Sequence, residues 1–224
     1  MTAEVVLYEN PGWGSAIVEA QLAVYAMPVR LVPAGGTRDP QAVARAMAEV
    51  NPLGQVPALV LPGGGVMTET AAMTLHLADL ARSDVLVPGP EAAERAAFLR
   101  WLVFLVAAVY PSFAYGDVPT RFVPEPGAAA FQARVIEHRK AMWRVMEAAA
   151  ASSFGSGPRF LGARFLGPWF LGARFSAIDV YLAVMTRWRP GPAWFQAETP
   201  RLWAAGAAAA GRAEVAPVMA RNFG

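Results

Sequence analysis

The sequence predicts an α/β domain followed by an all-α domain. Two observations lead to this fold class: short β-type apolar runs alternate with helical segments up to residue 82, and helical spacing dominates from residue 91 almost to the end. The segment between them, SDVLVPGP at 83–90, breaks the periodicity and contains two prolines, as linkers between domains often do. We therefore predict a first domain over 1–82, a linker over 83–90 and a helical domain over 91–224.

The first domain is predicted to alternate strands and helices. A Pro-Gly turn precedes the first helix, and the glycine turn at 63–65 separates two apolar runs, which indicates a hairpin. In chain order we predict strand 4–8, helix 15–26, strand 29–32, helix 40–50, hairpin strands 56–61 and 66–67, and helix 70–82. This order is that of a thioredoxin-like domain.

The second domain is predicted to consist of long helices. Apolar spacing predicts helices over 91–110, 127–151 and 177–188. Thr199 before Pro200 gives the N-cap and first-turn signal of another helix. Ser176 and Asp179 have the spacing of a helix-capping S/T-x-x-D motif, so we expect them to stabilise the fold rather than to take part in chemistry.

Composition argues against several classes of protein. The 224 residues are 55% hydrophobic and carry a net charge of +2, which indicates a large buried core and no nucleic-acid-binding surface. The apolar run 101–115 is interrupted by Pro111 and is too short to span a bilayer comfortably, so we expect no membrane contact. The N-terminus has no secretory-signal pattern, and a cytoplasmic location is expected. Without cysteine, disulfides and thiolate metal sites are excluded, and we expect no metal.

The most informative stretch is 51–80, NPLGQVPALVLPGGGVMTETAAMTLHLADL. Pro57 stands at the start of the first hairpin strand, where proline is tolerated because it has no ladder N–H to give. Thr68, Glu69 and Thr70 stand at the start of the following helix. Free backbone N–H groups and the positive end of the helix dipole favour an anion there. A ligand that carries a carboxylate could therefore dock at this helix start.

The order N-P-x-G-Q-V-P-A-L, hairpin, then E-T before an amphipathic helix resembles the glutathione-binding half of cytosolic glutathione transferases. The resemblance implies that family's fold, a thioredoxin-like domain followed by an all-α domain. It also implies a cis Pro57, which presents the backbone of Val56 to the cysteinyl part of glutathione, while Glu69 and Thr70 hold the γ-glutamyl end. We expect Gln55, Val56, Pro57, Glu69 and Thr70 to bind glutathione as a co-substrate.

Thiol activation is expected in the segment between the first strand and the first helix, YENPGWGS at 8–15. A free thiol with a pKa near 8.5 is only a few per cent ionised at neutral pH. Lowering that pKa by about two units needs roughly 2.7 kcal/mol of thiolate stabilisation. A hydroxyl donor can supply about 1.5–3 kcal/mol, and a helix N-terminus adds about 0.3–1 kcal/mol.

Three side chains are candidates for this donor, and we rank them in the order Ser15, Tyr8, Asn10. Ser15 stands at the expected helix start and matches the serine of theta, zeta, phi and tau transferases, but the same position also suits a simple N-cap. Tyr8 matches the tyrosine of alpha, mu and pi transferases, or is an ordinary strand aromatic. Asn10 is a third donor or a turn former. Gly14 stands where a beta-type cysteine would align, which argues against glutaredoxin-like mixed-disulfide chemistry.

The resemblance implies that the thiolate attacks a small hydrophobic electrophile, as in detoxification, in an apolar cleft between the domains. The candidate cleft residues, for each of which core packing is the other interpretation, are Trp13, Phe104, Tyr110, Phe113, Tyr115 and Trp188. A homodimer is also implied. The alternative function is a non-catalytic protein of the same fold that binds glutathione or a hydrophobic ligand. A structural module with a vestigial pocket is less favoured, because all the glutathione-binding matches are retained.

A tandem duplication precedes the capping motif. Residues 157–166 read GPRFLGARFL, and residues 167–176 read GPWFLGARFS. Two copies of ten residues are too few for a solenoid, so we expect a tolerated loop expansion or, alternatively, an added functional loop. Phe160, Phe165 and Trp169 would be unusually apolar for a solvated loop, and we expect them to pack on the helical domain.

Overall fold

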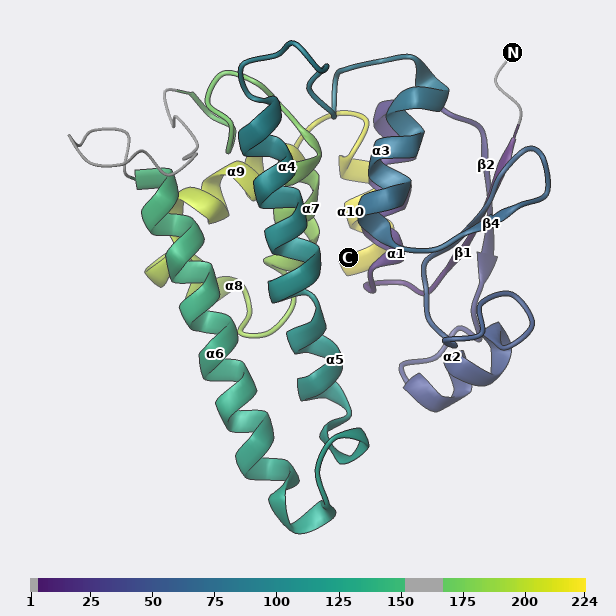
Figure 1. Ribbon diagram of the computed structural model, residues 1–224, viewed down its shortest axis with the longest axis vertical. Coiled ribbons are helices and arrows are strands. Elements are labelled where there is room, and N and C mark those ends of the chain that lie inside the picture. The colour runs from purple at the N-terminus through teal and green to yellow at the C-terminus, as the bar shows by residue number, and fades with distance from the viewer. Residues whose placement is uncertain (1–3, 152–166) are drawn as a thin grey trace. The chain divides into compact units, whose positions relative to one another are not determined.

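The computed structural model describes residues 4–151 and 167–224, which divide into two compact units (Figure 1). The first unit runs to Val87 and also includes the C-terminal segment from Ala208 to Gly224, whereas the second runs from Pro88 to Ala207. The chain therefore returns to its first unit at the end, which nothing in the sequence indicates.

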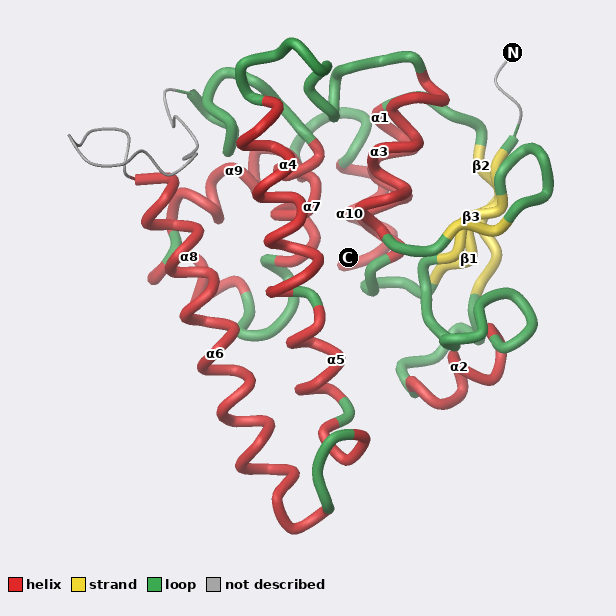
Figure 2. Tube along the Cα trace, in the orientation of Figure 1, coloured by secondary structure: helices red, strands yellow, loops and turns green. Residues whose placement is uncertain are grey.

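A four-stranded sheet forms the centre of the first unit, with the strand order β2-β1-β3-β4 (Figure 2). The strands are β1 (Val5–Glu9), β2 (Val29–Pro33), β3 (Ala58–Val60) and β4 (Val66–Met67). Strands β1 and β2 are parallel and are connected through helix α1 (Ser15–Val24). Strand β3 pairs antiparallel with both β1 and β4, so the predicted hairpin is confirmed.

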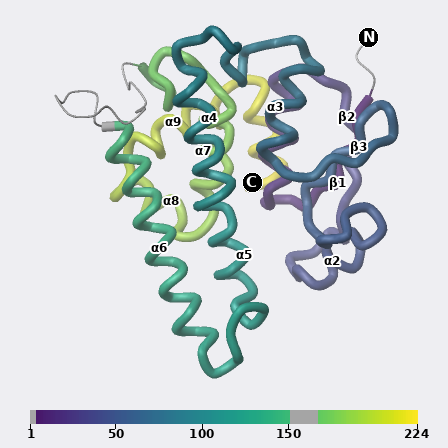
Figure 3. The backbone as a smooth tube through the Cα atoms, viewed as in Figure 1, coloured from purple at the N-terminus to yellow at the C-terminus, as the bar shows by residue number. Residues whose placement is uncertain are grey.

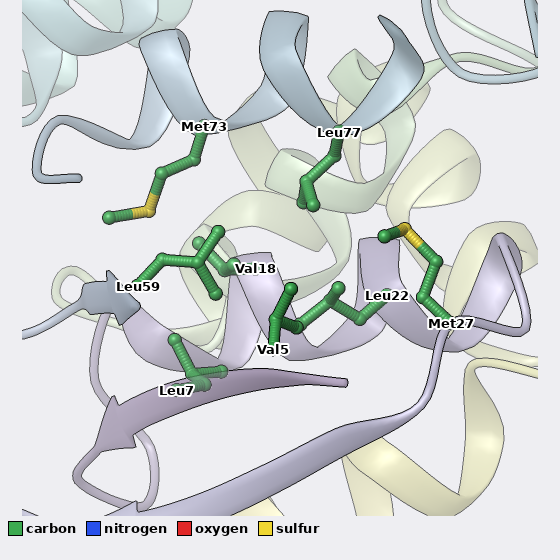
Figure 4. Close-up of a cluster of buried hydrophobic side chains, with 8 residues drawn as sticks. All are labelled: Val5, Leu7, Val18, Leu22, Met27, Leu59, Met73 and Leu77. Carbon is green, nitrogen blue, oxygen red and sulfur yellow. The ribbon is translucent and has the colours of Figure 1, made fainter. Parts of the chain in front are cut away.

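Helices cover both faces of this sheet because neighbouring strand residues point to opposite faces. On one face, β1 and β3 pack against α1 and α3 (Thr70–Ala81), and Figure 4 shows Met73 and Leu77 of α3 pointing toward the strands. On the other face, Ala58 packs with Val43 and Met47 of α2 (Pro40–Met47). The predicted thioredoxin-like order is thus confirmed. A further helix, α10 (Ala216–Phe223), belongs to the same unit.

The second unit is helical, which confirms the second half of the predicted fold class. Its helices are α4 (Arg95–Phe104), α5 (Pro111–Asp117), α6 (Glu125–Ala151), α7 (Ala177–Met185), α8 (Pro192–Glu198) and most of α9 (Pro200–Ala210), with a 3-10 turn at Pro119–Arg121. The core of this unit contains Trp101, Trp143 and Phe195, and the rings of the last two lie edge to face with centroids 5.2 Å apart.

The helix predicted over 91–110 starts four residues later and changes its winding before it ends. Residues Leu105–Val109 form a π-helical turn, in which the N–H of Tyr110 donates to the carbonyl of Leu105 at 2.8 Å. Pro111 follows immediately and has no N–H for the regular helical bond, which explains the altered winding. By length and composition alone, the whole stretch Arg95–Asp117 could also cross a membrane.

The capping box predicted at the start of α7 is confirmed. The N–H of Ser176 donates to Asp179 Oδ2 at 2.9 Å, and Ser176 in turn accepts the N–H of Asp179. The N–H of Phe170 donates to the other carboxylate oxygen, Oδ1, at 2.7 Å. Both Ser176 and Asp179 are fully buried, and this burial raises the pKa of the Asp179 carboxyl to about 7.

Only the second copy of the duplicated decamer lies within the described residues. The first copy, with Phe160 and Phe165, lies outside them. In the second copy the ring of Trp169 lies 4.8 Å from that of Phe175. Phe170 is fully buried, with its ring 5.5 Å from Trp101. The described copy therefore packs into the helical unit through its own aromatic residues.

Candidate functional site

Three segments of the first unit meet at one edge of the sheet. Ala58, the first residue of β3, lies opposite Tyr8 near the end of β1. Strand β4 runs antiparallel to β3 and therefore ends at the same edge as β1. The segments that adjoin these strand ends, 10–14, 56–57 and 68–69, consequently approach one another. Helices α1 and α3 begin directly after two of them and pack together.

The segment before β3 has a fixed backbone. The Val56–Pro57 peptide bond is cis, as the resemblance implies. Upstream, the side chain of Asn51 donates to the carbonyl of Gln55 at 2.8 Å. Gly54 has a φ of +63°, and a Cβ there would lie 2.8 Å from that of Ala44, so only glycine fits. The Gln55 side chain is exposed, and the Val56 backbone follows directly from this fixed turn.

The start of α3 has a strained residue beside free donors. Glu69 is exposed and adopts φ 66° and ψ 106°, a conformation that costs a non-glycine residue on the order of 1–3 kcal/mol. Thr70 follows it and is buried. Within 4–151 and 167–224, no hydrogen bond uses the N–H of Thr70 or of Ala71. An anion at this helix start would be bonded by these groups.

Ser15 is committed to the loop between β1 and α1. Its hydroxyl donates to the carbonyl of Asn10 at 3.1 Å and accepts the N–H of Asn10 at 3.0 Å. The side chain is fully buried, and the N-cap of α1 is Gly14 rather than Ser15. Ser15 therefore closes the loop into a ring and does not present a free hydroxyl.

The side chain of Asn10 also forms a hydrogen bond within the protein, whereas the Tyr8 hydroxyl forms none among the described residues. Asn10 is 2% exposed, and its amide nitrogen donates to the carbonyl of Thr37 at 2.8 Å. Tyr8 is half-buried and packs, with Trp13 and Val56, on the hydrophobic cluster between α2 and the sheet. In the described part of the chain no hydrogen bond engages the Tyr8 hydroxyl, nor the backbone N–H groups of Gly14 and Ser15.

The predicted hydrophobic substrate residues divide into separate groups. In the second unit, the rings of Tyr110, Phe113 and Trp188 form one cluster, with centroids 5.0–6.4 Å apart. The guanidinium of Arg139 lies 3.8 Å from the Phe113 ring centre. The other predicted residues have different neighbours, since Phe104 packs on Trp101, Tyr115 packs on Phe122 and Trp13 lies in the first unit.

Arg139 holds this aromatic cluster in place. It is fully buried and donates from Nε to the Ser112 hydroxyl at 2.8 Å and from a terminal nitrogen to the carbonyl of Arg189 at 3.2 Å. Burial lowers the pKa of Arg139 to about 10. The sequence gives no sign of this role, because Arg139 lies in α6 among exposed charged residues such as Arg134, Glu137 and Arg144.

A separate cavity of about 300 Å³ lies between α5 and α6. Its lining consists of Ala108, Ser112, Tyr115, Phe131, Arg134, Val135 and His138. Tyr115 is the single predicted substrate residue in this lining. Among the residues that the structure describes, no group of three His, Asp or Glu side chains could hold a metal ion.

Comparisons with known proteins agree on one family. A family model for the glutathione S-transferase N-terminal domain matches residues 19–80. The uncharacterized GST-like protein YncG of Escherichia coli (strain K12) is 34% identical over 218 residues, which cover 97% of this chain and 98% of YncG.

Two solved structures are similar over almost the whole chain. A glutathione transferase homologue from Sulfitobacter with bound glutathione is 25% identical, with a TM-score of 0.77 and coverage of 98% of each chain. A sphingomonad glutathione S-transferase complexed with glutathione is also 25% identical, with a TM-score of 0.73 and coverage of 98% of this chain and 100% of the other.

Proposed function

Because the chain belongs to the glutathione S-transferase family, we propose that it binds glutathione and stabilises the thiolate for attack on a small hydrophobic electrophile. The observation that carries this proposal is the meeting of three segments at one sheet edge, beside the N-termini of α1 and α3. Glutathione bound to the two similar structures supports the choice of ligand.

Each segment of the edge has a proposed role in binding. The γ-glutamyl carboxylate accepts hydrogen bonds from the start of α3 and from the Thr70 hydroxyl, and the Glu69 carboxylate accepts from the γ-glutamyl ammonium group. The backbone of Val56, held by cis Pro57, pairs with the cysteinyl part of the tripeptide. Gln55, which is exposed, contacts the ligand from the same turn. The strain at Glu69 supports this assignment, because strained residues cluster at ligand-binding sites.

The sulfur then lies near the start of α1, and we propose the Tyr8 hydroxyl as its first donor. Tyr8 ranks ahead of Ser15 and Asn10, because the donor groups of both those side chains already bond within the protein. The N–H groups of Gly14 and Ser15 add backbone donors and the helix dipole. One hydroxyl at about 1.5–3 kcal/mol and a helix start at about 0.3–1 kcal/mol together give about 1.8–4 kcal/mol, a range that includes the roughly 2.7 kcal/mol needed for a shift of about two pKa units.

In the proposed reaction the thiol proton leaves to solvent and the stabilised thiolate attacks the electrophile. A sulfur–carbon bond forms, and the leaving group departs with its electron pair. Tyr110, Phe113 and Trp188 offer an aromatic surface for the electrophile, with Arg139 holding Phe113. A cytoplasmic homodimer that acts in detoxification completes the proposal and is supported by family membership.

One observation favours a second candidate, a non-catalytic glutathione-binding protein of the same fold. The serine at the expected catalytic position is buried and fully bonded to Asn10. A carrier would still bind glutathione through α3 and Val56 but would not lower the thiol pKa.

The thiol pKa of bound glutathione, followed by thiolate absorbance against pH, separates the two functions. The enzyme requires a pKa well below about 8.5, and replacement Tyr8→Phe should raise it by at least about one unit, since it removes one charged hydrogen bond. Tyr25→Phe is the matched control in the same unit, because Tyr25 is the C-cap of α1 and lies at the opposite end of that helix from the site. An unshifted thiol in the parent protein identifies a carrier instead.

A further inference from the structure

We propose that Asn222 and Arg221, on the C-terminal helix α10, are positioning residues that set the loop between β1 and α1 for thiolate stabilisation. The inference rests on the function proposed above. Helix α10 belongs to the first unit and lies beside α1, as Figure 3 shows for the yellow end of the chain.

Asn222 fixes the middle of the loop. Its Oδ1 accepts the N–H of Gly12 at 3.0 Å, and its Nδ2 donates to Glu19 Oε2 at 3.0 Å and to the carbonyl of Val218 at 2.9 Å. The two amide protons therefore have acceptors, and the oxygen has a donor. Turning the amide over would set its NH₂ against the Gly12 N–H and its oxygen against the Glu19 carboxylate. The orientation of Asn222 is consequently defined by its partners.

Gly12 is adapted to this contact. Its φ is +78°, which favours glycine, and a Cβ there would lie 3.3 Å from the carbonyl oxygen of Asn222 and 3.7 Å from the ring of Phe223. The close approach of α10 to the loop thus depends on glycine at this position. The ring of bonds between Ser15 and Asn10 encloses Gly12, so the loop is held from inside by Ser15 and from outside by Asn222.

Arg221 holds the two sides of the same loop together. It forms a bidentate ion pair with Glu19 of α1, in which Arg221 Nε lies 2.8 Å from Glu19 Oε1, and it lies 3.4 Å from Glu9. Glu9 is the last residue of β1 and directly precedes Asn10. Both carboxylates are buried, and hydrogen bonding to Glu19 raises the pKa of Arg221 above its ordinary value. One guanidinium therefore ties the strand end, through Glu9, to the helix, through Glu19.

The consequence concerns the groups that would face sulfur. The N–H groups of Gly14 and Ser15 lie two and three residues after Gly12, and Tyr8 precedes Glu9 directly. If α10 no longer bonds to Gly12 and Glu9, the loop is no longer fixed. The Tyr8 hydroxyl and the two N–H groups then shift relative to the Val56 backbone, which is proposed to bind the cysteinyl part of glutathione. In the proposed function, glutathione affinity depends mainly on Val56 and on the start of α3. The hydrogen bonds and ion pairs of Asn222 and Arg221 involve neither of these.

The test compares Asn222→Ala with the parent protein by calorimetry and by thiolate absorbance. We expect the variant to bind glutathione within about three-fold of the parent, whereas the bound thiol pKa rises by about one unit, equivalent to a ten-fold loss of thiolate at a pH below the pKa. Glu214→Gln is the control, because it breaks the Glu214–Arg212 ion pair in the same C-terminal segment. It should leave both quantities unchanged.

The outcomes separate the inference from the proposed function. A parent protein that binds no glutathione, or binds it without a lowered thiol pKa, removes the proposed function and the inference with it. A parent with a lowered pKa that Asn222→Ala leaves unchanged overturns the inference alone. If Asn222→Ala does not fold, Arg221→Lys decides, since lysine keeps the charge but loses the bidentate pair. A raised thiol pKa supports the positioning role, and an unchanged one overturns it.

Discussion

The hydroxyl of Ser15 and the backbone of Asn10 bond to each other twice, once through the N–H and once through the carbonyl of Asn10, at 3.0 and 3.1 Å. Both residues are buried, so the two bonds are shielded from water. A serine that the family pattern marks as a thiol donor is therefore, in this conformation, a loop-closing residue. Its replacement should affect stability first.

We expect Ser15→Ala to lower the free energy of unfolding by about 1–3 kcal/mol, because the buried N–H of Asn10 loses its acceptor and the Asn10 carbonyl keeps only the N–H of Trp13. Urea denaturation measures the change. Ser83→Ala is the matched control: its hydroxyl accepts a long, exposed bond from Val85 N–H at 3.4 Å, so its effect should stay within about 0.5 kcal/mol. Equal stability of Ser15→Ala and the parent would rule out the loop-closing role.

Thr70→Val should weaken glutathione binding about ten-fold or more while the fold is retained. The replacement keeps the shape of the side chain and removes the hydroxyl beside the proposed carboxylate site, which corresponds to the loss of one charge-assisted bond. Isothermal calorimetry measures the affinity. Thr74→Val, one turn further along α3, removes a buried hydroxyl that bonds to the carbonyl of Thr70 and should leave the affinity unchanged. Similar losses for both variants would contradict a direct contact by Thr70.

Asp179 should make stability depend on pH. Its folded pKa of about 7 lies above the ordinary 3.8, so the folded state holds the proton more tightly than the unfolded state. Its contribution is therefore complete below about pH 4 and is lost as the pH rises through about 7, by on the order of 4 kcal/mol. The difference in free energy of unfolding between the parent and Asp179→Asn, measured across this range, should show that slope. A difference that is constant with pH would mean that the buried carboxyl titrates normally.

Much of the fold follows from local sequence signals. The hairpin, α3 and the capping box at Ser176 all follow from patterns within a few residues, such as the glycine turn and the S-x-x-D spacing. The sheet edge follows from the order of these elements together with the family resemblance. Local patterns predict these elements because the residues that make up each pattern also determine where the strand or helix begins and ends.

The features that the sequence does not predict are either short helices or contacts between residues far apart in the chain. Helices α5, α8 and α10 have seven or eight residues with proline in the first turn, too few for a clear apolar repeat. The bond from Asn222 to Gly12 joins residues 210 positions apart, and no local pattern encodes it. The predicted helix start at Ser15 is confirmed. The hydrogen-bond partner of the Ser15 hydroxyl is decided by the conformation of the loop and cannot be read from the residue type.

Calorimetric titration with glutathione and, separately, with cysteinylglycine tests most directly whether the sheet edge holds the tripeptide by its γ-glutamyl end. Cysteinylglycine retains the thiol and the part that would pair with Val56 but lacks the γ-glutamyl group, whose carboxylate and ammonium are proposed to dock at Thr70 and Glu69. We expect saturable heat with glutathione and binding at least about ten-fold weaker for the dipeptide. No heat at millimolar glutathione, or equal affinity for both peptides, would contradict glutathione recognition at this edge.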